Sequence, residues 1–175
     1  LRHPGAALTA LEVHPRRVAR LRQTLQQRGL TAQVIQADAA EWLETNDGTF
    51  DLILLDAPCS GSGTLQKHPE WPWLAHDDLP RLTGIQRRLL AAAAGRLSPG
   101  GLLIYAVCSW LPEEGEAHRE WLAEVQPDLR PAAVWPAALG VASEADGDTT
   151  AFFRPHPGRW EGEGFQAFAV TRPPR

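Results

Sequence analysis

Two cysteines, each followed by a serine, are the residues of this sequence best suited to covalent chemistry. Cys59 lies in "LLDAPCSGSG" and Cys108 lies in "LIYAVCSW", and each comes at the end of what reads as a strand. Asp56 stands shortly before Cys59. Thiolates are effective nucleophiles and a carboxyl group can exchange a proton with a substrate, so this set is suited to nucleophilic catalysis. Taken singly, a buried cysteine is more often a small apolar core residue.

Two further acids stand where a nucleotide-like cofactor could be bound. Glu12 ends the strand-like "AALTALEV", and Asp38 follows "TAQVIQA". An acid at the end of a strand, followed by a helix, commonly binds the ribose hydroxyls of such a cofactor, and Glu12 fits that role. Asp38 is placed to bind a second edge of the same ligand, such as an adenine amino group. The competing interpretation is that each acid is only a helix cap or a solvated residue.

The elements that must position these residues follow from the periodicity of apolar residues. Strands are predicted at residues 6–13, 31–37, 50–58 and 102–108, and helices at residues 14–30, 39–45, 79–97 and 112–125. This alternation predicts an α/β fold with an open, mostly parallel sheet and right-handed crossovers. Ligands bind beyond the carboxyl ends of the strands in such sheets, and the acids and cysteines above all fall there. Their clustering favours a functional site over five unrelated residues.

Three segments carry more specific expectations. The strand at residues 50–58 is apolar on consecutive positions, so it is expected to be buried on both faces of the sheet. Strands at residues 150–155 and 164–172 would add an antiparallel hairpin at the C-terminal end. The segment from residue 126 to 149, rich in Pro, Ala and Gly, is expected to be the least structured.

Composition and charge exclude several classes of protein. The 175 residues suggest one domain, and 43% hydrophobic with 22% charged residues is ordinary for a globular protein. The net charge of -4 gives no overall indication of a nucleic-acid binder. Two cysteines are too few for a disulfide scaffold or a Cys-rich zinc site, and no metal is expected. No apolar run approaches the ~20 residues of a membrane span and no signal peptide is seen, so a cytoplasmic protein with reduced thiols is expected.

The two cysteine segments together resemble one enzyme family. "DAPCSGSG" followed by "HPEW", and then "YAVCSWLPEEGE", closely resemble the Sun/Nop-type RNA cytosine-C5 methyltransferases. "LEVHPRRVARLRQTLQQRGL" is similar to the second cofactor motif of that family, "QADAAEW" to the third, and "GEGFQAFAVTR" to the final strand. The chain departs from the family pattern at Val107, where threonine is typical, and at Gln166, where a second phenylalanine is usual.

The resemblance implies a class I methyltransferase fold and S-adenosyl-L-methionine as cofactor. Glu12 would then hold the ribose, Asp38 the adenine side, and Asp56 would face both the cofactor and the target base. It further implies RNA, with ribosomal RNA expected, as the substrate and partner. Such a base must reach the site unpaired or flipped out.

The resemblance also assigns the two thiols. Cys108 would be the nucleophile that adds to C6 of cytosine, and Cys59 would help to release the product. Addition at C6 makes C5 nucleophilic enough to take a methyl group. Asp56 would bond N3 and stabilise the charge that develops there, while the Pro58 carbonyl could accept a hydrogen bond from the cytosine amino group.

One part of the family pattern is not found in these residues. The glycine-rich first motif and the accessory RNA-binding domain are expected upstream of Leu1, and the sequence contains no Met, so residues 1–175 are interpreted as a partial catalytic domain. The missing strand would lie between the strand ending at Glu12 and the one ending at Asp56. We therefore expect either an apolar gap between those two strands or their direct pairing, and weak cofactor binding by these residues alone.

Three alternatives remain open from the sequence. DNA cytosine-C5 methyltransferases carry their nucleophile in a Pro-Cys pair, and by that analogy Cys59 would attack and Cys108 would have no role. A catalytically incomplete copy could act only as an RNA or protein binding module. The plainest alternative is an α/β domain whose cysteines are core residues.

Overall fold

The computed structural model describes residues 5–71, 78–134, 152–154 and 163–174. These residues divide into two compact units, Leu1–Asp47 and Gly48–Arg175, and each is taken by itself below. Among the described residues no helix is both long and apolar enough to span a membrane.

The first unit is a βαβα segment. Its elements are β1 (Thr9–Glu12), α1 (Pro15–Gln27), β2 (Gln33–Gln36) and α2 (Ala39–Thr45). The strands β1 and β2 pair in parallel, with Glu12 opposite Gln36. Proline occupies the first turn of α1, where its missing N–H costs nothing. The predicted strands and helices are all present, and α2 has the predicted bounds.

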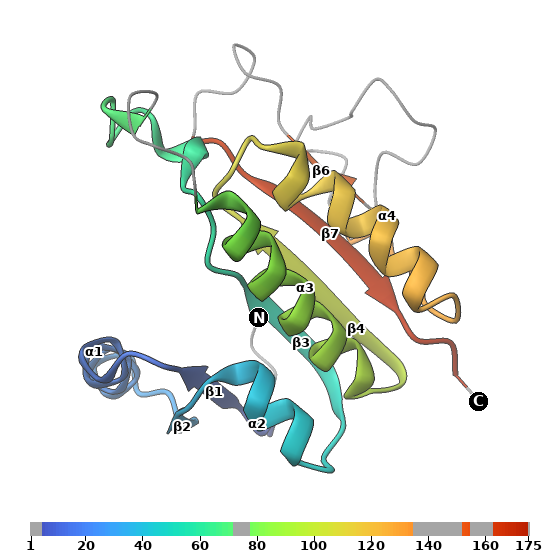
Figure 1. The fold of residues 1–175 in the computed structure, drawn as a ribbon. Helices are drawn as coiled ribbons and strands as arrows, with labels where there is room; N and C mark the ends of the chain where they lie inside the picture. Colours follow the sequence, from blue (N-terminus) through green and yellow to red (C-terminus); the bar gives the residue numbers. More distant parts are fainter. Residues whose placement is uncertain (1–4, 72–77, 135–151, 155–162, 175) are drawn as a thin grey trace. The chain divides into compact units, whose positions relative to one another are not determined.

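The second unit is a sheet with helices on one face. Its elements are β3 (Phe50–Asp56), η1 (Ser62–Thr64), α3 (Leu79–Gly95), β4 (Leu97–Val107), η3 (Pro112–Glu114), α4 (Glu116–Val125), β5 (Arg130–Pro131), β6 (Phe152–Phe153) and β7 (Gln166–Thr171). The strand order is β3-β4-β7-β5, with β6 also paired to β7 (Figure 1). The strands β3 and β4 are parallel, whereas β7 runs antiparallel to β4 and to β6. The predicted antiparallel C-terminal strands are therefore confirmed.

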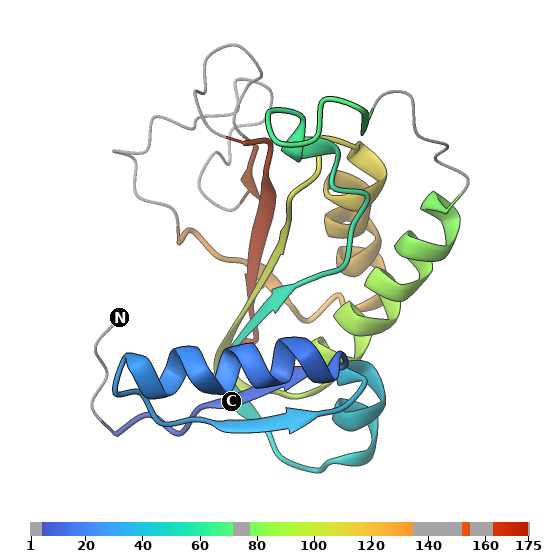
Figure 2. The same ribbon diagram turned by 90° about the vertical axis from the view of Figure 1, so that its left-hand side faces the viewer.

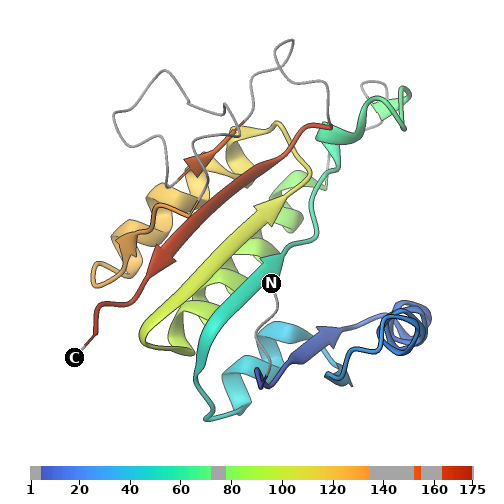
Figure 3. The same ribbon diagram turned by 180° about the vertical axis from the view of Figure 1, so that it is seen from behind.

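The core of this unit lies between the sheet and the helices α3 and α4. Both helices cover the same face, as the turned view and the view from behind show (Figures 2 and 3). Leu90 of α3, Leu103 and Tyr105 of β4 are completely buried, and Phe168 of β7 is 1% exposed. Because β4 and β7 are paired on both sides, their side chains supply most of this core.

The expectation that the strand at residues 50–58 is buried on both faces is wrong. In β3, Leu52 is 51% exposed and Leu54 is 68% exposed. Successive side chains along a strand point to opposite faces of the sheet. Leu52 and Leu54 share the exposed face, while Ile53 and Leu55 on the other face are half-buried. β3 is paired only to β4, so it is an edge strand of this sheet. Of the two arrangements expected for β1 and β3, direct pairing is not found, because β1 belongs to the two-stranded sheet β1-β2 and β3 pairs with β4 in the other sheet.

The remaining differences concern element boundaries. β4 begins at Leu97 and not at Leu102, because the predicted "SPGG" turn is a bulge within the strand. Gly100 has a φ of 79°, in the left-handed region that a residue without Cβ reaches easily. A 3-10 turn, η3, precedes α4 where one continuous helix was predicted. The segment expected to be least structured contributes β5 at Arg130–Pro131, and its residues 135–149 lie outside the described ranges.

Candidate active site

The two cysteines meet at the carboxyl ends of β3 and β4. Asp56 is paired with Ala106 at the end of this parallel ladder, and Ala57 N–H donates to the Ala106 carbonyl at 3.1 Å. The chain continues from both strands in the same direction, which brings Cys59 Sγ within 3.4 Å of Cys108 Sγ. Both cysteines are half-buried and neither forms a disulfide. The alternative in which the cysteines are unrelated core residues therefore does not describe this arrangement.

The pKa values of the two thiols are shifted in opposite directions. Either sulfur atom can donate the hydrogen bond that joins them. With Cys59 as the donor, this bond and a backbone hydrogen bond lower the pKa of Cys108 from 9.0 to about 7. The pKa of Cys59 is raised, first by its hydrogen bond to Cys108 and then by burial and by the negative charge on Cys108. When the pair carries one proton, that proton is on Cys59 and the negative charge is on Cys108. Cys108 is therefore the more acidic of the two thiols.

Asp56 and Pro58 flank this pair. The Asp56 side chain is exposed, and its charge raises the pKa of Cys108, which places the carboxyl group within electrostatic reach of that sulfur. The Pro58 carbonyl oxygen accepts a hydrogen bond from Gln86 Nε2 at 2.7 Å. A base amino group at Pro58 would thus use the second lone pair of that oxygen.

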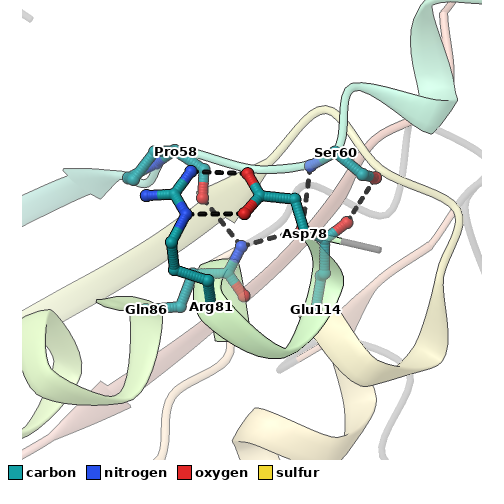
Figure 4. A network of polar contacts seen from close by, with 6 residues as sticks. All are labelled: Pro58, Ser60, Asp78, Arg81, Gln86 and Glu114. Carbon is teal, nitrogen blue, oxygen red and sulfur yellow. Dashed lines mark hydrogen bonds and ion pairs between the residues drawn. The ribbon is translucent and has the colours of Figure 1, made fainter. Parts of the chain in front are cut away.

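A buried carboxyl group holds the turn that carries Cys59 (Figure 4). Glu114, in η3, is completely buried. Its Oε1 accepts from Ser60 N–H at 2.8 Å and from Gln86 Nε2 at 2.9 Å, and its Oε2 accepts from Ser60 Oγ at 2.6 Å. Gln86, in α3, is also fully buried and contacts His118 Nε2 through its own Oε1 at 2.7 Å. In the same view an exposed ion pair joins Asp78 to Arg81 at the start of α3.

The serines that follow the cysteines belong to the same network. Ser109 Oγ accepts from Leu111 N–H at 3.0 Å, which shapes the turn after Cys108. The same oxygen lies 2.9 Å from Ser62 Oγ, and Ser60 Oγ lies 3.4 Å from it. Ser109 and Ser62 are buried, so these contacts exclude water. The paired Cys-Ser sequences therefore join the two turns side by side.

The last strand, β7, and the residues just before it also contact the turns that carry the cysteines. Gln166, at the start of β7, is fully buried and donates through Nε2 to the carbonyls of Ser109 and Leu111, each at 2.9 Å. Gly63 N–H donates to the Cys108 carbonyl at 3.1 Å, and Gly164 N–H donates to the Gly63 carbonyl at 2.6 Å. Three segments far apart in the sequence thus meet around Cys108.

The two acids expected at the cofactor lie in the first unit, at the ends of its paired strands. Glu12 Oε1 accepts from His14 N–H at 2.8 Å, and Oε2 lies 3.8 Å from Arg17 Nη1. Asp38 Oδ1 accepts from Glu41 N–H at 2.9 Å and caps α2. Asp38 is therefore a helix cap, as the competing interpretation held, but capping uses one of about four acceptor positions of a carboxylate.

Sequence reasoning missed Gln86, Glu114 and Gln166. Glu114 directly follows Glu113, and nothing in "PEEGE" distinguishes the buried acid from the exposed one. Gln166 gave one signal, since it stands where phenylalanine is usual in the resembling family. A tryptophan in this loop can either stack on a base or pack the loop itself. Trp71 Nε1 donates to the Ser60 carbonyl at 2.8 Å, which packs the loop, while Trp73 lies outside the described residues.

Comparison with known sequences gives one consistent result. A family model described as "16S rRNA methyltransferase RsmB/F" matches residues 1–168. The chain is 40% identical over 143 residues to ribosomal RNA small subunit methyltransferase B of Vibrio cholerae, covering 79% of this chain and 32% of that protein. It is 37% identical over 166 residues to the protein of the same name from Salmonella arizonae, covering 93% of this chain and 36% of that protein. The chain thus spans about a third of the length of these curated relatives.

Comparison with solved structures agrees on the fold. A methyltransferase homologue from Pyrococcus horikoshii superposes with a TM-score of 0.77 at 28% identity, covering 95% of this chain and 53% of that one. NSun6 from the same organism, solved with SFG, gives a TM-score of 0.79 at 22% identity and covers 95% of this chain and 41% of that one. The predicted α/β, Rossmann-like fold of class I methyltransferases is confirmed.

Proposed function

The chain belongs to the 16S rRNA methyltransferase RsmB/F family, and on that basis we propose that it carries the catalytic residues of an S-adenosyl-L-methionine-dependent enzyme that methylates C5 of cytosine in ribosomal RNA. The relatives named as ribosomal RNA small subunit methyltransferases support the substrate class. The observation that carries the reaction type is the pair of thiols 3.4 Å apart, of which one is acidic and the other is not.

The first unit offers groups that suit the cofactor. S-adenosyl-L-methionine supplies an electrophilic methyl group. Its ribose hydroxyls and its adenine amino group can donate hydrogen bonds to the protein. Glu12 and Asp38 are acceptors at the ends of neighbouring parallel strands, and the backbone contact of Glu12 with His14 fixes its carboxyl group there. Glu12 would hold the diol and Asp38 the amino group.

Cys108 starts the reaction in this proposal. With a pKa of about 7 the thiol is half ionised at neutral pH. The thiolate adds to C6 of cytosine, a carbon–sulfur bond forms, and the electron pair of the C5–C6 double bond moves toward C5 and N3. Asp56, exposed at the end of β3, would bond N3 and stabilise the charge that gathers there. C5 thereby becomes able to accept a methyl group.

Cys59 changes its role once Cys108 has reacted. The hydrogen bond to Cys108 and the charge of its thiolate are two of the causes that raise the pKa of Cys59. Adduct formation removes both, so Cys59 becomes more acidic and can release its proton to water. The Cys59 thiolate then takes the proton from C5, the C5–C6 double bond re-forms, and the C6–S bond breaks with its electron pair returning to Cys108. The cycle releases one proton and restores the starting pair.

Covalent trapping tests the proposal. RNA containing 5-azacytidine has a nitrogen at position 5, which carries no proton to remove, so a thiol adduct at C6 persists. The test uses the full-length enzyme, which is expected to include the glycine-rich cofactor motif. We expect its wild-type form and Cys59→Ala to form the adduct in the presence of cofactor, and Cys108→Ala to form none. The reverse pattern would assign attack to Cys59, as in the DNA enzymes. The absence of an adduct and of methylation in all proteins would support a binding module and refute the proposed function.

A further inference from the structure

Glu114 makes contacts that are unusual for an acid in the interior of a protein. Burying a carboxyl group is costly unless hydrogen bonds replace its water. Among the residues that the structure describes, three groups donate to the Glu114 side chain; all are neutral, and two of them, N–H and Oγ–H, belong to Ser60. Ser60 directly follows Cys59, so these two bonds fix the backbone of the turn that carries this thiol.

The other side of Cys59 is held through the same group. Gln86 Nε2 lies between Glu114 Oε1 at 2.9 Å and the Pro58 carbonyl at 2.7 Å. The residues before and after Cys59 are therefore both tied to Glu114, one directly and one through Gln86 (Figure 4).

Glu114 is in turn fixed to the strand that carries Cys108. The Tyr105 hydroxyl, on β4 and completely buried, donates to the Glu114 backbone carbonyl at 2.8 Å. Tyr105 lies on the same strand that ends just before Cys108. The path from one thiol to the other thus runs from Cys59 through Ser60, Glu114 and Tyr105, and every link is a hydrogen bond or the chain itself.

We infer that Glu114 is a positioning residue that holds the Cys59 turn against the Cys108 turn, so that the two sulfur atoms stay at their hydrogen-bonding separation of 3.4 Å. The inference rests on the proposed function and deepens it, because that reaction uses the two thiols in succession at one site. The negative charge of Glu114 also contributes to the raised pKa of Cys59, and so helps to keep the proton on the thiol that does not attack.

Thiol–disulfide equilibrium measures the separation without RNA or cofactor. In a glutathione buffer the Cys108 thiolate displaces one glutathione thiolate from oxidised glutathione, and Cys59 displaces the second as the Cys59–Cys108 disulfide forms. The fraction of this disulfide, determined by acid quenching and mass spectrometry, gives the effective concentration of one thiol at the other. We expect Glu114→Ala to lower it by about tenfold, since several hydrogen bonds that hold the turn are lost.

Three variants make the test decisive. Glu113→Ala, the matched control at an exposed neighbouring acid, should behave as wild type. Glu114→Gln should stay within about twofold of wild type, because a rotated Ser60 hydroxyl can accept from the new amide and the contacts persist. Ser60→Ala, which keeps its backbone N–H, should lower the effective concentration by roughly threefold and decides the matter if Glu114→Ala does not fold.

The inference would be overturned if Ser60→Ala and a folded Glu114→Ala both gave the same effective thiol concentration as the wild type. The same holds if Glu113→Ala lowers the effective concentration as much as Glu114→Ala, since the effect would then not belong to the buried acid. Folding of each variant is followed by thermal unfolding. Because the assay contains no methylation step, failure of the proposed function would leave its result unaffected, and the reverse is also true.

Discussion

Replacing Cys59 with alanine removes the hydrogen bond between the Cys59 and Cys108 sulfur atoms. That hydrogen bond is the largest cause of the lowered pKa of Cys108, while burial and the charges of Asp56 and Glu163 act in the opposite direction. In Cys59→Ala the opposing effects remain and the main stabilising one is gone. The pKa of Cys108 should therefore return from about 7 toward its ordinary 9.0.

The size of the effect on reactivity follows from two competing factors. A thiol with a pKa of about 7 is half ionised at pH 7, whereas one with a pKa of 9.0 is ionised to roughly 1%, a loss of about fiftyfold in thiolate. The more basic thiolate is also more nucleophilic, and a Brønsted coefficient of about 0.4–0.5 over two pKa units returns roughly eightfold. Alkylation of Cys108 should therefore be about sixfold slower than wild type at pH 7 and about eightfold faster above pH 10.

The assay is the rate of Cys108 alkylation by iodoacetamide across this pH range, with the modified peptide quantified by mass spectrometry. The wild-type and Cys59→Ala curves should cross, which a general change in accessibility would not produce. Cys108→Ala serves as the converse control, because Cys59 loses a hydrogen bond and a charge that raise its pKa and should react at lower pH than in wild type. A midpoint for Cys108 that stays near 7 in Cys59→Ala would refute the coupling of the two thiols.

Two further predictions concern stability. Leu103→Ala, at a fully buried position in β4, should lower the free energy of unfolding by about 2–5 kcal/mol, whereas Leu54→Ala, at a 68% exposed position in β3, should cost about 0.5 kcal/mol or less in urea denaturation. The pKa of His118 is lowered from 6.5 to about 4, mainly by burial and then by the charge of Arg87, so the unfolded state takes up the proton first as the pH falls. Stability should decline from about pH 6.5 to about pH 4, and His118→Gln, which keeps a donor near Gln86, should show a smaller decline in denaturation curves measured across that window; an equal decline would exclude His118 as its source.

The meeting of the two thiols could be predicted from the sequence because it depends only on topology. Cys59 and Cys108 each follow an apolar strand, and neighbouring parallel strands end at the same edge of a sheet. The pKa difference between them could not be predicted, since it depends on a sulfur–sulfur distance of 3.4 Å and on which thiol is nearer to Glu114.

The hydrogen bonds that hold the two cysteine turns could not be predicted from the sequence either, for a different reason. Glu113 and Glu114 are adjacent and identical, and only the 3-10 turn that precedes α4 decides which one turns inward. The apolar pattern of β3 likewise predicts burial on both faces. That pattern does not show how many strands pair with β3, and in its sheet β3 has only β4 as a neighbour. The long-range partners of a residue are properties of the assembled sheet.

The backbone bridge from Gly164 through Gly63 to Cys108 has a consequence for which substitutions this site can tolerate. Its two hydrogen bonds join main-chain atoms, so they do not depend on the identity of any side chain. They do depend on closeness: a Cβ at Gly63 would run into the Gly164 carbonyl, and one at Gly164 would run into the Trp110 ring. The geometry around Cys108 therefore depends on the lack of side chains at these two glycines, and at both positions even alanine would displace a segment that contacts the Cys108 turn.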